Sequence, residues 1–131
     1  MNTIISSLLI LCILPIVCSW IGGYYRQQQL GSVDNKEPRN QWQQLTGPGA
    51  RAVAAQGNSW EALAVYSAAI LALFVGGVDL RSVSTLVMVF IALRIAYIPA
   101  YIGNVDKLRS LLFLGSYGIC MYFFYLALST N

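Results

Sequence analysis

Polar side chains stand at helical spacing inside stretches that are otherwise apolar enough to cross a bilayer. Asn58 and Glu61 lie three residues apart in one such stretch, and Arg94 is the only charge inside another. An ionised group costs roughly 2.5–3.5 kcal/mol in a membrane helix on insertion scales, so it normally faces the bundle interior and pairs. We therefore predict an internal ion pair of Glu61 with Arg94, braced by Asn58. This pair has a structural role, a ligand-binding role, or both.

Other polar residues continue the same helical faces, because residues three and four apart share a face. The faces contain, stretch by stretch, Arg51, Ala54, Asn58, Glu61 and Val65; then Arg94, Tyr97 and Tyr101; then Arg109, Ser110, Phe113 and Tyr117. Three helices thus each present polar groups towards the same end. The pattern predicts either a convergent polar site or a polar structural core.

The composition identifies the kind of element that carries these faces. Of 131 residues, 57% are hydrophobic and only 10% are charged, against about a quarter charged in a soluble domain. This excludes an ordinary soluble globule. The net charge of +3 is scattered along the chain, so no nucleic-acid partner is expected. The length suits a single domain over residues 1–131.

Four apolar stretches predict helices at about residues 3–24, 50–75, 81–102 and 106–128. Each is close to the ~20 residues that span the hydrocarbon core, and a lipid-exposed backbone must satisfy its own hydrogen bonds, as a helix does. The first stretch lacks the basic start and cleavage site of a signal peptide, so we expect it to be retained. The prediction is an all-α, multi-pass integral membrane protein, a four-helix bundle with a polar loop over about residues 26–49.

Lysine and arginine are distributed unequally between the two ends of these helices. The first and third loops carry Arg26, Lys36, Arg39, Arg51, Lys107 and Arg109, whereas the opposite side carries only Arg81. Cytoplasmic loops of membrane proteins are enriched in these two residues. We therefore expect loops 1 and 3 to be cytoplasmic.

The cysteines do not point to a metal or to thiol chemistry. Cys12, Cys18 and Cys120 all lie in apolar runs, and the chain has no histidine. Buried cysteine behaves as a small hydrophobe, and no spacing typical of a metal site is present. We expect packing roles for all three and no metal.

Two longer strings carry a family resemblance. RAVAAQGNSWEALAVY (51–66) and RIAYIPAYIGNVDKLRS (94–110) resemble the MAPEG superfamily, the membrane-associated proteins in eicosanoid and glutathione metabolism. The four predicted spans and the long first loop also fit, so the resemblance covers nearly the whole chain. DNKEPRNQ (34–41) is similar to a bacterial subgroup of that family, which implies a bacterial inner membrane.

The resemblance implies a homotrimer that binds glutathione between neighbouring subunits, near the cytoplasmic face. By position, the residues that it implies for glutathione binding are Arg51, Gln56, Asn58, Glu61, Tyr97, Tyr101 and Ser110. It implies that Arg109 is catalytic and stabilises the glutathione thiolate, and that Arg94 is structural. Arg26 falls loosely where a loop arginine of the family reaches the site.

The function implied is a glutathione-dependent membrane transferase, with or without peroxidase activity, that attacks a hydrophobic electrophile. Ala54 stands where the well-studied eicosanoid enzymes carry another arginine, and Gly57 and Ala62 also replace larger residues. These departures leave an alternative open: a non-enzymatic membrane trimer that binds a lipid-soluble ligand or another anion in the same intersubunit pocket. A small four-helix multidrug exporter fits less well, because the first stretch lacks the carboxylate that those proteins use.

Overall fold

The computed structural model describes residues 1–130, and Asn131, the last residue of the predicted domain, lies outside the described residues. The helices in chain order are α1 (Asn2–Leu30), α2 (Pro38–Gln44), α3 (Gly47–Val75), α4 (Ser84–Ile102) and α5 (Asp106–Ser129). Four of them, α1, α3, α4 and α5, are long and apolar enough to cross a membrane. The predicted all-helical architecture with four candidate membrane spans is confirmed.

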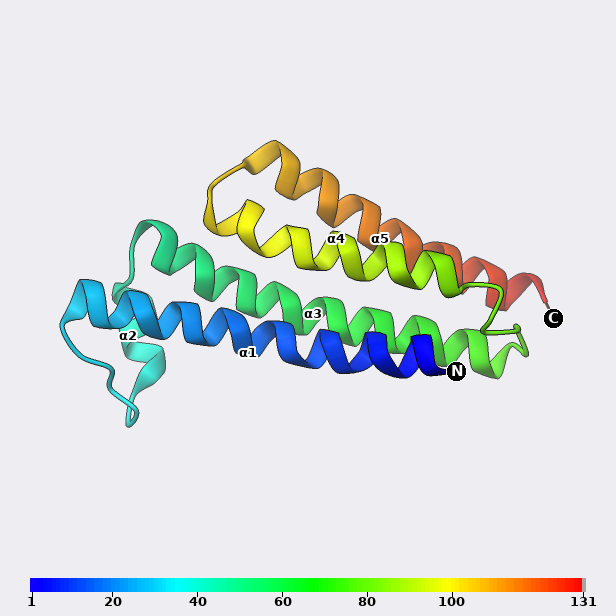
Figure 1. Cartoon of the computed structure of the whole chain (residues 1–131), viewed down its shortest axis with the longest axis horizontal. Coiled ribbons are helices and arrows are strands. Elements are labelled where there is room, and N and C mark those ends of the chain that lie inside the picture. The colour runs from blue at the N-terminus through cyan, green and yellow to red at the C-terminus, as the bar shows by residue number, and fades with distance from the viewer. Residues whose placement is uncertain (131) are drawn as a thin grey trace.

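The four long helices form two packed pairs (Figure 1). Helix α1 packs against α3, α4 packs against α5, and α3 also contacts both α4 and α5. Helix α1 contacts α4, whereas α1 and α5 make no contact within residues 1–130. Both termini and the α3–α4 turn lie at one end, and the segment containing α2 lies with the α4–α5 turn at the other.

Two helical segments extend into the region expected to be a loop. Helix α1 continues to Leu30, past its expected end near residue 24, and stops where Gly31 adopts a left-handed conformation with φ 79°. The Gly31 amide donates to the Gln27 carbonyl oxygen at 3.1 Å, a common way of ending a helix. Helix α2 begins with Pro38, whose fixed φ suits the first turn.

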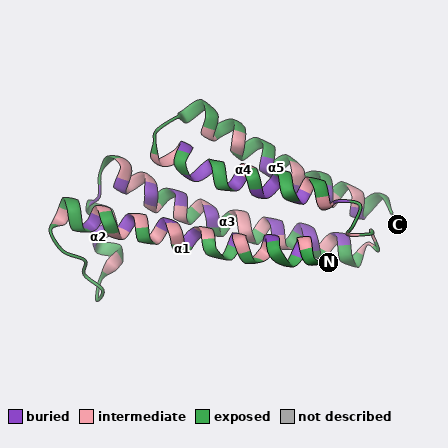
Figure 2. Cartoon of the chain, in the orientation of Figure 1, coloured by how far each residue is buried: buried purple, intermediate pink, exposed green. Residues whose placement is uncertain are grey.

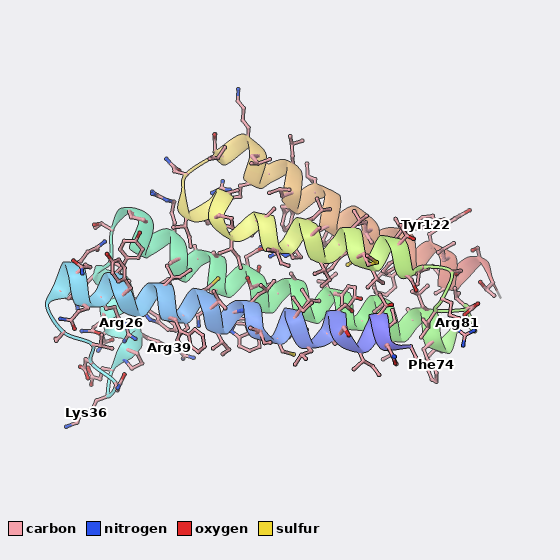
Figure 3. The ribbon with its side chains drawn as sticks, viewed as in Figure 1. Arg26, Lys36, Arg39, Phe74, Arg81 and Tyr122 are labelled. Atoms are coloured by element: carbon pink, nitrogen blue, oxygen red, sulfur yellow. The ribbon has the colours of Figure 1, made fainter. Side chains whose placement is uncertain are left out.

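The basic end of the molecule is organised around Arg26. Its side chain is 7% exposed, and its Nη1 donates to Gln41 Oε1 at 3.3 Å and to the Asp34 carbonyl oxygen at 3.4 Å. Gln41 also donates to the Ser32 carbonyl oxygen at 3.0 Å. Figure 3 places Arg26, Lys36 and Arg39 at the α2 end, with Arg81 at the opposite end. The basic residues of the first loop therefore lie at the opposite end of the molecule from Arg81, as predicted.

The core lies along the lines where the helices meet, and the outer faces are exposed (Figure 2). At its centre the Tyr66 ring stacks on Phe90 with centroids 4.5 Å apart, and the Tyr66 hydroxyl hydrogen-bonds the Ser7 hydroxyl at 2.6 Å. Large apolar side chains such as Trp20 and Phe74 stay exposed on the outside. A helix that is apolar on all sides is typical of a membrane span.

The close approach of α3 and α5 depends on the absence of a side chain at Gly76. A Cβ there would lie 2.8 Å from the Ala127 carbonyl oxygen and 3.1 Å from its Cα. Gly76→Ala should therefore push the helices apart and lower the free energy of unfolding by about 1–3 kcal/mol, as overpacking does. Thermal unfolding in detergent, followed by circular dichroism, measures this effect.

Gly118→Ala is the matched control, because a Cβ at Gly118 meets nothing within 4 Å. It should leave stability unchanged or raise it by up to about 1 kcal/mol through helix propensity. Equal behaviour of the two variants would contradict a tight α3–α5 contact at Gly76.

Candidate functional site

An open groove of about 430 Å³ lies where α3, α4 and α5 converge. Its walls are Asn58 of α3, Tyr97 and Tyr101 of α4, and Arg109, Ser110, Phe113 and Leu114 of α5. Small-molecule sites commonly have volumes of ~300–1,000 Å³. The structure thus brings together, within one chain, predicted site residues that lie as far apart in sequence as Asn58 and Ser110.

A tight turn between α4 and α5 places Arg109 opposite Tyr101. Helix α4 ends at Ile102, Asn104 has a positive φ of 60°, and the Arg109 amide donates to the Val105 carbonyl oxygen at 2.9 Å in the first turn of α5. Asparagine tolerates this left-handed conformation better than most residues. The chain therefore reverses within a few residues, and the start of α5 faces the end of α4.

Two aromatic rings packed edge-to-face support the Arg109 guanidinium. Its Cζ lies 4.5 Å from the centre of the Tyr101 ring, and Tyr101 packs edge-on against Tyr97 with centroids 5.6 Å apart. Such cation–π contacts contribute roughly 0.5–2 kcal/mol. The guanidinium makes no hydrogen bond or ion pair to residues 1–130. Its donors consequently remain available for an anion in the groove.

Arg94 is buried beside this groove and is held by Asn58. Only 1% of Arg94 is exposed. Its Nη2 donates to Asn58 Oδ1 at 2.7 Å and, more weakly, to the Asn58 carbonyl oxygen at 3.5 Å. Its Cζ lies 4.3 Å from the centre of the Tyr97 ring. The short bond to Oδ1 has the length of a charge-assisted hydrogen bond.

The direct ion pair predicted between Glu61 and Arg94 is replaced by a chain of hydrogen bonds through Asn58. Asn58 Nδ2 donates to Glu61 Oε2 at 3.4 Å, while Asn58 Oδ1 accepts from Arg94. Arg94 makes no ion pair within residues 1–130. The physical reason is that the Asn58 carboxamide lies between the two charged groups and hydrogen-bonds both of them.

Two other predicted residues lie outside the groove. Arg51 is half-buried, and its Nε donates to the Ile102 carbonyl oxygen at 2.9 Å, which ties the start of α3 to the end of α4. Gln56 is half-buried on α3. It lies two residues from Asn58, or about 200° around a helix with 3.6 residues per turn, so it points away from this groove. Arg26, which hydrogen-bonds Gln41 of α2, does not line the groove either.

A smaller cavity of about 150 Å³ adjoins the groove and shares Asn58 and Phe113 with it. Its remaining walls are Glu61, Ala62, Val65, Phe90, Arg94, Ser116, Tyr117 and Cys120. We did not predict Phe90, Ser116 or Cys120 as lining residues. The signal was present on α5, where Phe113, Ser116, Tyr117 and Cys120 follow the helical spacing of three and four.

The polar groups that line the groove are hydrogen-bond donors. No group of three or more histidine, cysteine, aspartate or glutamate residues that could hold a metal ion exists within residues 1–130. The groove offers a guanidinium, tyrosine and serine hydroxyls, and a carboxamide. These groups donate hydrogen bonds to carboxylates or thiolates.

The fold and groove define a small multi-pass membrane protein with a polar, arginine-containing groove lined by three of its helices. Comparison with family models matches the MAPEG family over residues 3–129. The chain therefore belongs to the MAPEG family, which includes membrane glutathione-related transferases and peroxidases and leukotriene-related proteins. Neither the search of curated proteins nor the search of solved structures found a match.

The hydrogen bonds of Arg94 make Asn58 more important for stability than Glu61. Asn58→Leu should lower the free energy of unfolding by about 1.5–3 kcal/mol, because it leaves a buried guanidinium without its charge-assisted partner. Glu61→Gln should cost less than about 1 kcal/mol, because its one hydrogen bond is long and glutamine keeps an oxygen that can accept it. Thermal unfolding of the two variants in the same detergent makes the comparison. A larger loss from Glu61→Gln would mean that Glu61, not Asn58, compensates the Arg94 charge.

Proposed function

We propose that the protein is a glutathione-dependent membrane transferase that activates the glutathione thiolate for attack on a hydrophobic electrophile. The observation that carries the proposal is the Arg109 guanidinium, which is held over Tyr101 at the edge of the groove and has no hydrogen-bond partner within residues 1–130. Membership of the MAPEG family supports glutathione as the anion.

Arg109 supplies the chemistry that such a reaction needs. A free thiol has a pKa near ~8.5, and a neighbouring guanidinium lowers that pKa, which favours the nucleophilic thiolate at neutral pH. The thiol proton leaves to solvent, the sulfur forms a bond to an electrophilic carbon, and the leaving group departs with its electron pair. Peroxidase activity is a variant in which the same thiolate attacks a peroxide oxygen and the O–O bond breaks. The departing alkoxide takes a proton to form an alcohol, and a second glutathione converts the resulting sulfenic acid to glutathione disulfide and water.

The other predicted residues hold the tripeptide. Tyr97, Tyr101, Asn58 and Ser110 line the groove, and the exposed Glu61 carboxylate suits the glutathione ammonium. The Nη groups of Arg51 suit a glutathione carboxylate, because only Nε bonds Ile102. Bidentate contacts of this kind are strong.

A homotrimer accounts for the position of Gln56. Because Gln56 points away from the groove of its own chain, we propose that it contributes to the glutathione site of a neighbouring subunit. The exposed apolar side chains on the outer helix faces, such as Trp60 and Leu111, leave surface for both subunit and lipid contacts. A site shared between subunits makes assembly a condition of binding.

The proposed location is a bacterial inner membrane, with the α2 end in the cytoplasm. Arg26, Lys36 and Arg39 lie at that end (Figure 3), and Arg109 lies in the first turn of α5 after the short α4–α5 turn. Positive loops remain on the cytoplasmic side. The groove thus opens where cytoplasmic glutathione is present.

Titration of the purified protein with glutathione, followed by the ultraviolet absorbance of the thiolate, tests the proposal. We expect a saturable signal at pH 7, where only a few per cent of a free thiol is ionised. The signal should fall as the pH drops through the lowered pKa of the bound thiol. In Arg109→Gln that pKa should return towards ~8.5, whereas Arg109→Lys should keep part of the shift.

The binding of S-methylglutathione distinguishes the transferase from the alternative function, a non-enzymatic trimer that binds an anion. This compound keeps both carboxylates and the ammonium but cannot ionise at sulfur. The specific observation that favours a non-enzymatic anion-binding trimer is the exposed Ala54, which leaves no guanidinium between Arg51 and Asn58 on this face. Tight binding of both compounds with no thiolate signal would contradict the transferase and support the alternative.

A further inference from the structure

The segment that joins α1 to α3 folds back beside α1 instead of extending beyond its end (Figure 1). Helix α2, within this segment, contacts both α1 and α3. Arg26 Nη1 donates to Gln41 Oε1 at 3.3 Å. The Gln29 carboxamide both donates to the Thr46 carbonyl oxygen and accepts from the Thr46 amide, each at 3.0 Å. These bonds fix the segment against the long helices.

The segment is held at the level where α1 leaves the apolar part of the membrane. No charged side chain precedes Arg26, so the residues before it supply the ~20 that span the hydrocarbon core. Trp20 and Tyr24 are 70% and 59% exposed on α1, and such side chains gather at the membrane–water interface. Because Gln41 is bonded to Arg26, α2 lies at the depth where phospholipid headgroups are expected.

The outer face of this segment carries two cations without partners. Arg39 lies two residues from the buried Gln41, or about 200° around the helix, so it points away from the long helices. Lys36 is exposed and projects away from the bundle (Figure 3). Neither side chain makes a hydrogen bond or an ion pair within residues 1–130. Both therefore have donors available for phosphate oxygens.

A carboxylate lies beside the two cations. The walls of an open hollow of about 520 Å³ are Lys36, Glu37, Pro38, Arg39 and Asn40. Glu37 Oε2 accepts from Asn40 Nδ2 at 2.6 Å, whereas Glu37 Oε1 has no partner within residues 1–130. The nearby Asp34 carboxylate accepts from the Lys36 and Glu37 amides and does not line the hollow. The hollow thus offers two cations and one free carboxylate oxygen.

We propose that this hollow binds the headgroup of an ethanolamine phospholipid from the surrounding membrane. The lipid phosphate accepts from Lys36 and Arg39, and the lipid ammonium donates to Glu37 Oε1. Phosphatidylcholine carries the same charges, but its trimethylated ammonium has no N–H to donate. Phosphatidylglycerol has no ammonium, and Glu37 repels its net negative charge. The site is independent of the transferase reaction.

Native mass spectrometry of the delipidated full chain in detergent tests the proposal. Phosphatidylethanolamine, phosphatidylcholine and phosphatidylglycerol with the same acyl chains are added at equal concentrations and distinguished by mass. We expect the ethanolamine lipid to bind about two- to fivefold more tightly than either of the others, as one exposed charged contact allows. Equal binding of the three lipids, or tighter binding of phosphatidylglycerol, would overturn the proposal.

Soluble phosphoethanolamine, which has the headgroup without acyl chains, distinguishes a lipid site from a site for a free zwitterion. At the concentration of the lipid it should leave the bound phosphatidylethanolamine in place, because the acyl chains supply much of the binding free energy. Full displacement by the soluble compound would overturn the membrane lipid as the occupant.

The variant Lys36→Gln combined with Arg39→Gln removes both cations. It should weaken binding of phosphatidylethanolamine by about tenfold or more, because each cation near a phospholipid surface contributes about fivefold. Arg81→Gln is the control, since Arg81 lies at the opposite end (Figure 3), and it should bind like the wild type. Unchanged binding in the double variant, or equal weakening in the control, would overturn the site.

Glu37→Gln tests the carboxylate separately. Glutamine keeps an oxygen that can accept from Asn40 but has no charge for the lipid ammonium. The preference for phosphatidylethanolamine should disappear, and phosphatidylglycerol should bind at least as well as it does to the wild type. Asp106→Asn makes the same kind of change in the first turn of α5, outside the hollow, and should keep the preference. An unchanged preference in Glu37→Gln would contradict the choice of an ethanolamine headgroup.

Discussion

The buried guanidinium of Arg94 is the constraint on which the organisation of this bundle depends. A charge placed among membrane helices must be given polar partners by its neighbours. Asn58 from α3 accepts its shortest hydrogen bond, and Tyr97, one turn further along α4, offers its ring face. The Asn58 contact ties α3 to α4 at the level where the groove begins, and the Tyr97 contact, made within α4, holds the Tyr97 ring against Arg94. The groove residues Asn58 and Tyr97 are therefore positioned by a structural requirement.

The groove itself is built on rigid elements. Its polar groups come from three helices, and side chains on packed helices are held more accurately than those on loops. The one loop that matters is the short turn at Gly103–Val105, which brings Arg109 over Tyr101. Arg94 and Arg109 each lie over a tyrosine of the same edge-to-face pair. One cation is buried and holds helices together, while the other remains available to a ligand.

Much of this arrangement could be predicted from the sequence, because membrane helices obey simple rules. Length and apolar composition predicted the four spans, and helical spacing placed Asn58, Tyr97 and Tyr101 on converging faces. The direct pairing of Glu61 with Arg94 was wrong, since spacing identifies a face but not which of two polar groups one turn apart reaches a partner. Helix α2 was missed because it has only seven residues in a polar segment and its position depends on contacts with Arg26.

The assignment of the glutathione-binding residues also stays a prediction, because helical spacing gives the direction of a side chain but not the ligand that it reaches. Helical spacing shows that Gln56 and Asn58 point in different directions, but only a neighbouring subunit could bring both to one ligand. Helical spacing places Ser116 and Cys120 on one face of α5 with Phe113, but the cavity that this face lines became visible only once the separation of α3, α4 and α5 was known. A face can be read from a sequence, whereas a cavity depends on how closely the helices approach.

The most direct measurement of the central claim is a double-mutant cycle between Asn58 and Arg94. The free energy of unfolding is measured for the wild type, Asn58→Leu, Arg94→Leu and the double variant under one set of conditions. If the two side chains satisfy each other, each single change is costly and the double change costs much less than their sum, with a coupling of about 1.5–3 kcal/mol. Additive effects within about 0.5 kcal/mol would contradict the account, because a group other than Asn58 would then stabilise the Arg94 charge in the membrane.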